Sequence, residues 1–157
     1  MPDLLTHTAT SYLVGYRYLS SPLVALLVFG SALPDLLSRV PEIILHRFLD
    51  FPVYHFFSAF HTPFGLLLAC YLISFSFKER QRVETFFCLL FGSALHFLMD
   101  LMQEQFYLGV YMPYFPFSFK VIQWPFFDIN ASLYIAPIIG GVAVLIWRKK
   151  QLSIRHK

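Results

Sequence analysis

The stretch that decides the fold runs from Leu133 to Trp147, LYIAPIIGGVAVLIW, and is followed at once by Arg148, Lys149 and Lys150. An uncharged apolar run that stops at a basic cluster is typical of a membrane helix ending at the cytoplasmic surface. A tryptophan at that junction fits the preference of indole rings for the membrane interface. The stretch therefore predicts a hydrophobic helix that crosses the bilayer.

The composition extends this prediction to the whole chain. Hydrophobic residues make up 57% of the 157 residues and charged residues 13%, whereas soluble proteins average about 45–50% and about 25%. A soluble protein of this size needs charge to cover its large surface. The apolar surplus must therefore face lipid, and we expect one membrane-embedded domain over residues 1–157, an all-α bundle of about four to five hydrophobic helices.

Four further segments predict the other helices. Phe56–Phe77 and Val83–Met102 are apolar and flank a basic turn, which indicates a helical hairpin. Pro22–Leu37 is a shorter apolar run. Leu4–Tyr16 predicts a helix of about 20 Å, which is shorter than the hydrocarbon core of about 30 Å, so we expect it to enter part-way or to pack on the other helices.

The remaining segments are predicted to connect the helices. Ser38–His55 is mixed and polar, and Gln103–Asn130 is rich in Phe, Tyr and Pro. The second of these is expected at the interface, either as a plain anchor or, through Phe106–Phe127, as an entry for a lipid.

The basic residues predict the orientation. With the turn at residues 78–82 and the tail at residues 148–157 in the cytoplasm, Arg39, Arg47 and Lys120 lie outside. The other nine of the twelve Lys and Arg residues then lie inside: Arg17, Lys78, Arg80, Arg82, Arg148, Lys149, Lys150, Arg155 and Lys157. We therefore expect a multi-pass protein of the inner (plasma) membrane with a cytoplasmic C-terminus.

Several classes of protein are disfavoured. Basic residues lie beside apolar segments rather than in runs with interleaved aromatics, so no nucleic-acid partner is expected. Cys70 and Cys88 both lie in apolar runs and are interpreted as buried small hydrophobes rather than as a disulfide. The N-terminus has no basic region before an apolar core, as a signal peptide would.

A short repeat links two of the segments. Phe29-Gly30-Ser31-Ala32-Leu33 and Phe91-Gly92-Ser93-Ala94-Leu95 have the same sequence. Small residues allow helices to approach closely in lipid. We interpret the repeat as two packing faces rather than as a duplication.

Four ionisable side chains lie within or at the ends of the apolar segments: Asp35, His61, His96 and Asp100. An Asp at the bilayer centre costs about 2.5–3.5 kcal/mol on insertion scales, so such a residue is a functional hypothesis by default. His96 and Asp100 are four residues apart, on one helical face, and could reach the same ion at about 2.0–2.2 Å. A hydrogen-bonded His–Asp pair joining two helices has the same spacing, so the pair alone leaves both interpretations open.

The predicted orientation favours the metal interpretation of these residues. Together with His7, near the start of the chain, they make five metal-competent side chains that come from four segments to one outer end of the bundle. The orientation was derived from Lys and Arg alone, so the grouping is independent evidence. It predicts a metal site near the outer (periplasmic) face.

Five other polar residues are predicted near that end of the bundle. His46 and His55 are expected to contact the ligands or solvent rather than a metal. Arg39 and Arg47 suit bidentate phosphate binding or the extension of their guanidinium groups to lipid headgroups. Asp128 is expected to cap the last helix.

These residues form a recognisable pattern. The pattern comprises His7, Gly30-Ser31-Ala32-Leu33-Pro34-Asp35, His61-Thr62, Gly92-Ser93-Ala94-Leu95-His96 with Asp100, Pro116-Phe117-Ser118 and Phe127-Asp128. It resembles the YdjM-like inner-membrane proteins, which are described as metal-dependent hydrolases, from residue 3 to about residue 140. Leu-Pro-Asp and His-x-x-x-Asp are its most specific parts.

The resemblance implies a ligand set. The family is grouped with the zinc-dependent phospholipase C and single-strand nuclease superfamily, whose all-helical sites bind zinc through His and Asp. It implies that Asp35, His61, His96 and Asp100 surround one zinc ion, with His7 and a bridging Asp100 on a second. The chain has Leu36-Leu37-Ser38 where relatives often carry a second Asp, and it lacks the His-rich stretch of a third zinc site, so one or two ions are expected.

Two classes of function follow. The first is a membrane-bound zinc-dependent hydrolase of phosphoester (lipid-like) substrates, with Asp35, His96, Asp100 and Arg39 as the catalytic group. The alternative is a non-catalytic membrane protein whose metal or polar cluster locks the bundle or binds a partner, since four N/O ligands leave zinc no open position. A transporter is disfavoured because no clear inverted repeat is present.

Overall fold

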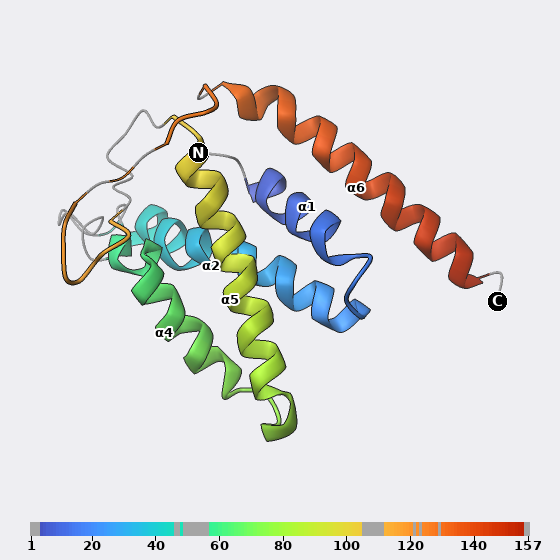
Figure 1. The fold of residues 1–157 in the computed structure, drawn as a ribbon, viewed down its shortest axis with the longest axis horizontal. Helices are drawn as coiled ribbons and strands as arrows, with labels where there is room; N and C mark the ends of the chain where they lie inside the picture. Colours follow the sequence, from blue (N-terminus) through green and yellow to red (C-terminus); the bar gives the residue numbers. More distant parts are fainter. Residues whose placement is uncertain are drawn as a thin grey trace.

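The protein is all-helical in the computed structural model, which describes residues 4–45, 48, 57–104, 112–120, 122, 124–128 and 130–155. Within these ranges the α-helices are α1 (Leu4–Gly15), α2 (Ser21–Leu45), α4 (Pro63–Ser74), α5 (Glu79–Met102) and α6 (Ala131–Arg155). A short 3-10 helix, η1 (Ser58–His61), precedes α4 (Figure 1). The all-α prediction is confirmed.

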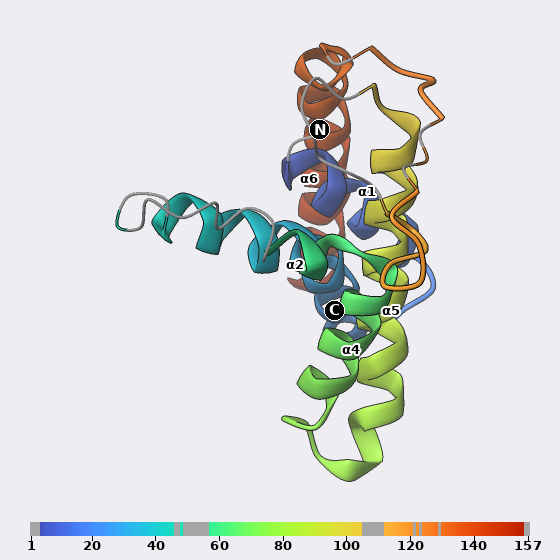
Figure 2. The same ribbon diagram turned by 90° about the vertical axis from the view of Figure 1, so that its left-hand side faces the viewer.

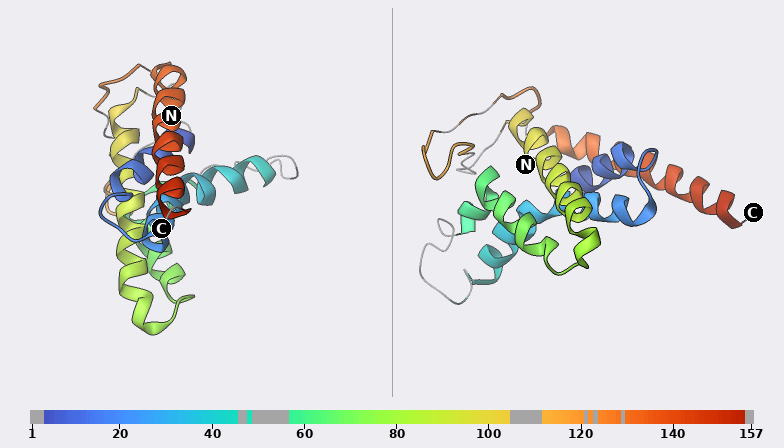
Figure 3. Two further views of the ribbon diagram at one scale, coloured as in Figure 1. Left: turned by 90° about the vertical axis from the view of Figure 1, so that its right-hand side faces the viewer. Right: turned by 60° about the horizontal axis from the view of Figure 1, so that its bottom comes forward.

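Helices α2 and α5 form the centre of the molecule. Helix α1 packs on α2, α5 and α6, and α4 packs on α5 and on η1. Helix α2 runs across α5 rather than alongside it, and its C-terminal part extends away from the other helices (Figure 2). Helix α6 lies on the outside of the bundle (Figure 3).

The two central helices meet at the repeated Gly-Ser-Ala sequence. A Cβ atom at Gly30 would collide with the carbonyl oxygen of Leu89, and one at Gly92 with that of Leu27. Because Pro34 has no N–H, the Gly30 carbonyl lacks its usual donor within the helix, and the Ser93 hydroxyl donates to it at 2.9 Å. The predicted close packing of the two Gly-Ser-Ala faces is confirmed.

The apolar core lies beside this crossing. Leu33, Leu66, Cys70 and Leu89 form a buried cluster between α2, α4 and α5. Both cysteines are free; Cys70 is fully buried and Cys88 partly so. Their interpretation as small hydrophobes rather than as a disulfide fits these positions.

Helix α2 is longer than predicted. The expected end at Leu37 is wrong, since the helix continues to Leu45 with Pro34 and Pro41 inside it, so the first part of the Ser38–His55 connection is helical. Prolines are tolerated inside membrane helices where neighbouring groups satisfy the freed backbone atoms, as Ser93 does for Gly30. Asp35 therefore lies in the middle of its helix rather than at the end.

The segment Phe56–Phe77 is not one helix. Proline disfavours the helical conformation in the residue before it, and Thr62, which precedes Pro63, is extended with φ −122° and ψ 153°. The Thr62 side chain accepts a hydrogen bond from the Gly65 N–H at 3.1 Å, which caps α4. At 12 residues, α4 is about 18 Å long.

Two helices of the described part, α2 and α5, are long and apolar enough to cross a membrane by length and composition. The predicted four to five spanning helices exceed this number. Helix α6 contains the Leu133–Trp147 stretch and continues through the basic tail to Arg155; that it also crosses the bilayer remains a prediction.

Large apolar side chains cover much of the outer surface. On α6, Leu133 is 70% exposed, Ile138 67% and Leu145 68%. The described part of the connection between α5 and α6 is non-helical, as predicted, and Phe117 on it is 90% exposed. Apolar patches of this extent are uncommon on soluble monomers and suit contact with lipid.

Candidate metal centre

Four elements bring the five candidate ligands together. His7 comes from α1, Asp35 from α2, His61 from the end of η1, and His96 and Asp100 from α5. On α5 the buried residues form one stripe that ends in the two ligands: Thr85, Leu89, Gly92, Ser93, His96 and Asp100. This spacing of three and four places the ligands on the face that packs against α2.

Asp100 lies at the centre of the cluster and is fully buried. Its Oδ2 lies 3.0 Å from Nε2 of His61 and 3.0 Å from Nε2 of His96. Its Oδ1 lies 3.3 Å from Nε2 of His7. The two oxygens of one carboxylate thus face different histidines, as a bridging ligand would require.

Asp35 forms the edge of the cluster that reaches the surface. Its Oδ1 lies 4.0 Å from Nε2 of His96, and its side chain is 18% exposed. The His61 side chain is 12% exposed, whereas those of His7 and His96 are fully buried. A molecule from outside can therefore approach through the side formed by Asp35 and His61.

The backbone assigns the tautomer of His96. Its Nδ1 lies 2.8 Å from the Ser31 carbonyl oxygen, which can only accept, so Nδ1 carries the hydrogen. Nε2 is then directed at Asp100 and Asp35. The ring also stacks on His7, with centroids 3.8 Å apart.

The same argument applies to His61. Its Nδ1 lies 3.1 Å from the Ser38 hydroxyl, and that hydroxyl donates its only hydrogen to the Pro34 carbonyl at 2.6 Å. Ser38 therefore accepts from Nδ1–H, and Nε2 of His61 is directed at Oδ2 of Asp100. Ligand histidines commonly donate their second ring nitrogen to a protein acceptor in this way.

The cluster contains a side-chain hydrogen bond to the carboxylate, between Nε2 of His61 and Oδ2 of Asp100 at 3.0 Å. The buried Nε2 of His96 and Oδ1 of Asp100 make no hydrogen bond in the structure. These two atoms could therefore bind a cation. The donor set of imidazole nitrogens and carboxylate oxygens fits a divalent ion such as zinc.

The ligand atoms form two overlapping groups. His7, His96 and Asp100 make one, Asp35, His61 and His96 the other, and the ligand atoms within each group lie within 4.8 Å of one another. Ligands at about 2.0–2.2 Å around a tetrahedral ion are about 3.4 Å apart. The arrangement can accommodate one or two ions.

The other polar residues singled out in the sequence are not part of the His–Asp cluster. Arg39 is one helical turn beyond Asp35 on α2, and its guanidinium lies 4.0 Å from the Glu42 carboxylate. Asp128 accepts a hydrogen bond from the Asn130 N–H at 3.0 Å, immediately before α6. His46, Arg47 and His55 lie outside the described residues.

Sequence reasoning missed Ser38 and the Ser31 carbonyl as partners of the ligands. Ser38 follows Asp35 by three residues, so helix geometry places it on the same face. That spacing is the signal that could have identified it.

Replacing Ser38 with Ala is expected to weaken metal binding about 10- to 100-fold, the usual effect of losing a hydrogen-bond partner of a ligand histidine. Competition with a chromogenic chelator measures the affinity. Ser38→Thr keeps the hydroxyl and should bind nearly as tightly as the wild type, and Ser76→Ala, in the exposed turn before α5, controls for loss of a serine. An unchanged affinity in Ser38→Ala would show that His61 is not oriented by this hydroxyl.

Comparisons with known proteins identify a family. No curated protein and no solved structure matches the chain. The family described as YdjM inner membrane protein matches residues 1–155, which covers every ligand of the cluster. The chain belongs to the YdjM inner membrane protein family.

Proposed function

We propose that this protein is a zinc-dependent hydrolase of phosphoesters in the membrane. The observation that carries the proposal is the orientation of His61 and His96, whose N–H groups are held on Ser38 and the Ser31 carbonyl while both Nε2 atoms face Asp100 at 3.0 Å. Such an arrangement is prepared for a cation. Inner-membrane family membership supports a substrate that is reached from the bilayer.

Each candidate ligand would have a defined role. Asp35, His61, His96 and Asp100 would hold one ion, with His7 and Asp100 available to a second. A zinc ion supplies Lewis acidity, which lowers the pKa of water to about 7 and polarises a phosphoryl oxygen. The backbone and hydroxyl partners of His61 and His96 keep both imidazoles neutral and fixed in direction.

The surface edge of the cluster would receive the phosphoester. Asp35 and His61 are the ligands with exposed area, and Arg39 follows Asp35 by one turn on the same side of α2. A guanidinium there can pair with the phosphate oxygens in a bidentate manner. The Glu42 carboxylate, 4.0 Å from the guanidinium, would compete with the phosphate for Arg39.

The alternative is a structural metal or polar cluster without catalysis. The full burial of His7, His96 and Asp100 favours it, since a closed set of four ligands leaves no position for water. The two functions differ in what happens when the protein is loaded with metal and given a substrate.

The deciding experiment is an activity assay on the purified full-length protein. We expect hydrolysis of a chromogenic phosphodiester or a phospholipid that is lost on chelation and restored by adding zinc. Manganese and magnesium serve as comparison ions. Stoichiometric metal without hydrolysis of any phosphoester would support the structural cluster instead.

Removing the Arg39 guanidinium tests its role. Arg39→Ala is expected to lower kcat/KM for a phosphodiester by at least about tenfold, less than the about 10²–10³ lost with a buried oxyanion-hole donor because Arg39 is partly exposed. Steady-state kinetics measure this at constant metal content. Arg80→Ala, at the exposed start of α5, should leave kcat/KM unchanged, and equal values for all three proteins would remove Arg39 from the proposal.

We also propose that the metal cluster faces the periplasm and the C-terminus the cytoplasm, from the distribution of Lys and Arg. A periplasmic reporter inserted after Asp100 should be active, and one fused after Arg155 silent. The opposite pattern would reverse the orientation.

A further inference from the structure

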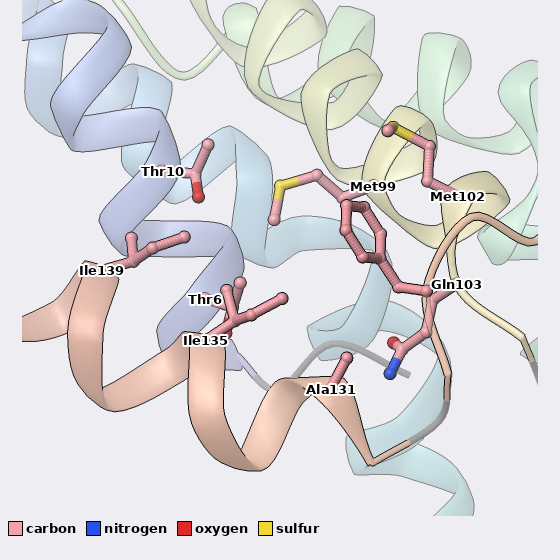
Figure 4. Close-up of a pocket in the computed structure, with 9 residues that line it drawn as sticks. Thr6, Thr10, Met99, Met102, Gln103, Ala131, Ile135 and Ile139 are labelled. Atoms are coloured by element: carbon pink, nitrogen blue, oxygen red, sulfur yellow. The ribbon is translucent and has the colours of Figure 1, made fainter.

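An apolar pocket lies between α1, α5 and α6 (Figure 4). Thr6 and Thr10 of α1 form one wall, Met99 of α5 a second, and Ile135 and Ile139 of α6 a third. Figure 4 shows Met99 extending from α5 toward the space between α1 and α6. In the described part of the chain, α6 packs on α1 and not on α5, and the pocket lies in the gap this leaves.

The pocket and the cluster are neighbours on two helices. Thr6 precedes His7 on α1, and Met99 precedes Asp100 on α5. Successive residues of a helix point about 100° apart, so the pocket residues lie on the faces adjacent to the ligands. The contact between His7 and Asp100 at 3.3 Å therefore joins the same two helices whose neighbouring residues line the pocket.

The size and lining of the pocket restrict its ligand. Its volume is about 230 Å³, larger than the apolar cavity of about 150 Å³ that accepts benzene and smaller than the about 300–1,000 Å³ of typical small-molecule pockets. This volume suits a section of one hydrocarbon chain rather than the two chains of a phospholipid. Met99 and Met102 supply flexible apolar side chains that adapt to such a chain.

We propose that this pocket binds a single hydrocarbon chain of a membrane lipid. In an inner-membrane protein the surrounding apolar molecule is lipid, and the pocket opens beside the exposed apolar face of α6, where Ile138 is 67% exposed. Binding of the chain does not depend on the proposed function. Only the further step, that the bound lipid is the substrate and places its phosphoester at the metal cluster, rests on it.

Photo-crosslinking tests binding of the chain without requiring metal or catalysis. Full-length protein in nanodiscs is given a phospholipid with a diazirine near the end of one chain, and labelled residues are identified by mass spectrometry. Labelling of Met99 and Met102 is expected in the wild type. Ile135→Trp fills the pocket and should reduce that labelling by about tenfold or more, which is the loss of affinity expected when about two methylene groups are no longer buried.

Ile138→Trp is the matched control, because this residue is three positions along the same helix and faces outward. It should leave the labelling of Met99 and Met102 unchanged. Equal labelling of these residues in wild type and Ile135→Trp, or labelling confined to the exposed face of α6, would overturn the inference. Formation of a dimer through α6 that excludes the probe would also overturn it.

Chain-length dependence tests whether the bound lipid is the substrate. For phosphoesters of increasing alkyl length, kcat/KM in the wild type should rise by up to about fourfold per methylene buried. The rise should disappear in Ile135→Trp and persist in Ile138→Trp, with the same detergent in all assays. Hydrolysis without chain-length dependence would overturn the inference but would leave the proposed function unaffected. Labelling of the pocket without hydrolysis of any ester would overturn the proposed function but would leave the binding of a hydrocarbon chain in the pocket unaffected.

Discussion

Asp100→Ala is expected to abolish stoichiometric metal binding. The two oxygens of this buried carboxylate lie within 3.3 Å of His7, His61 and His96, so its removal takes a ligand from the His7–His96–Asp100 group and the carboxylate contact from His61 and His96 of the other group. Loss of a hydrogen-bond partner of a ligand already costs about 10- to 100-fold in affinity, and loss of the central ligand should exceed that. Elemental analysis of protein purified in detergent measures the metal content.

Two comparisons make the result specific. His96→Ala should lose metal in the same way, because His96 belongs to both ligand groups. Asp128→Ala removes an exposed carboxylate outside the cluster and should retain the full content. Elution volume and helical circular dichroism establish that each variant is folded. Equal zinc in folded wild type, His96→Ala and Asp100→Ala would end the metal hypothesis.

Gly92→Ala is expected to destabilise the helix crossing that supports the cluster. The added methyl group would collide with the Leu27 carbonyl and come within 2.7 Å of the Ser31 backbone nitrogen. Backbone atoms cannot move aside as side chains do, so α2 and α5 must separate. Overpacking costs typically about 1–3 kcal/mol, which lowers Tm by about 2–12 °C in a protein of this size.

The matched control is another glycine of a helix interior. A Cβ atom at Gly141 on α6 meets nothing within 4 Å, so Gly141→Ala should leave Tm unchanged or raise it, since Ala is favoured over Gly in helices by about 0.5–1 kcal/mol. Thermal unfolding in one detergent compares the two variants. A Gly92→Ala protein as stable as the wild type would mean that the two helices do not approach this closely.

Local sequence predicted α1, α5 and α6 well, and for physical reasons. Each is an apolar run next to a clear change in composition, although α5 already starts at Glu79 and α6 continues through the basic tail to Arg155. Helices α2 and α4 were harder. The predicted end of α2 at Leu37 is passed, since the helix continues through Pro41 to Leu45, whereas Pro63, inside the predicted run Phe56–Phe77, starts a new helix.

The difference between these prolines comes from their surroundings. The Gly30 carbonyl, freed by Pro34, accepts a hydrogen bond from the Ser93 hydroxyl of α5, 63 positions away along the chain. No local pattern contains that information. Pro63, in contrast, has Thr62 before it as a cap, a combination that a closer reading of the local sequence could have detected.

The amino-acid sequence by itself determined the class of protein, the membrane environment and the identity of the five metal-competent residues. These follow from composition, from apolar runs and from the cost of placing Asp and His in lipid, all of which are properties of the chain that do not depend on its folding. The tertiary structure alone decided which atoms face one another. The crossing at Gly30 and Gly92 brings the Ser31 carbonyl to His96 and Asp35 to the same cluster, and such contacts depend on how helices distant in sequence pack.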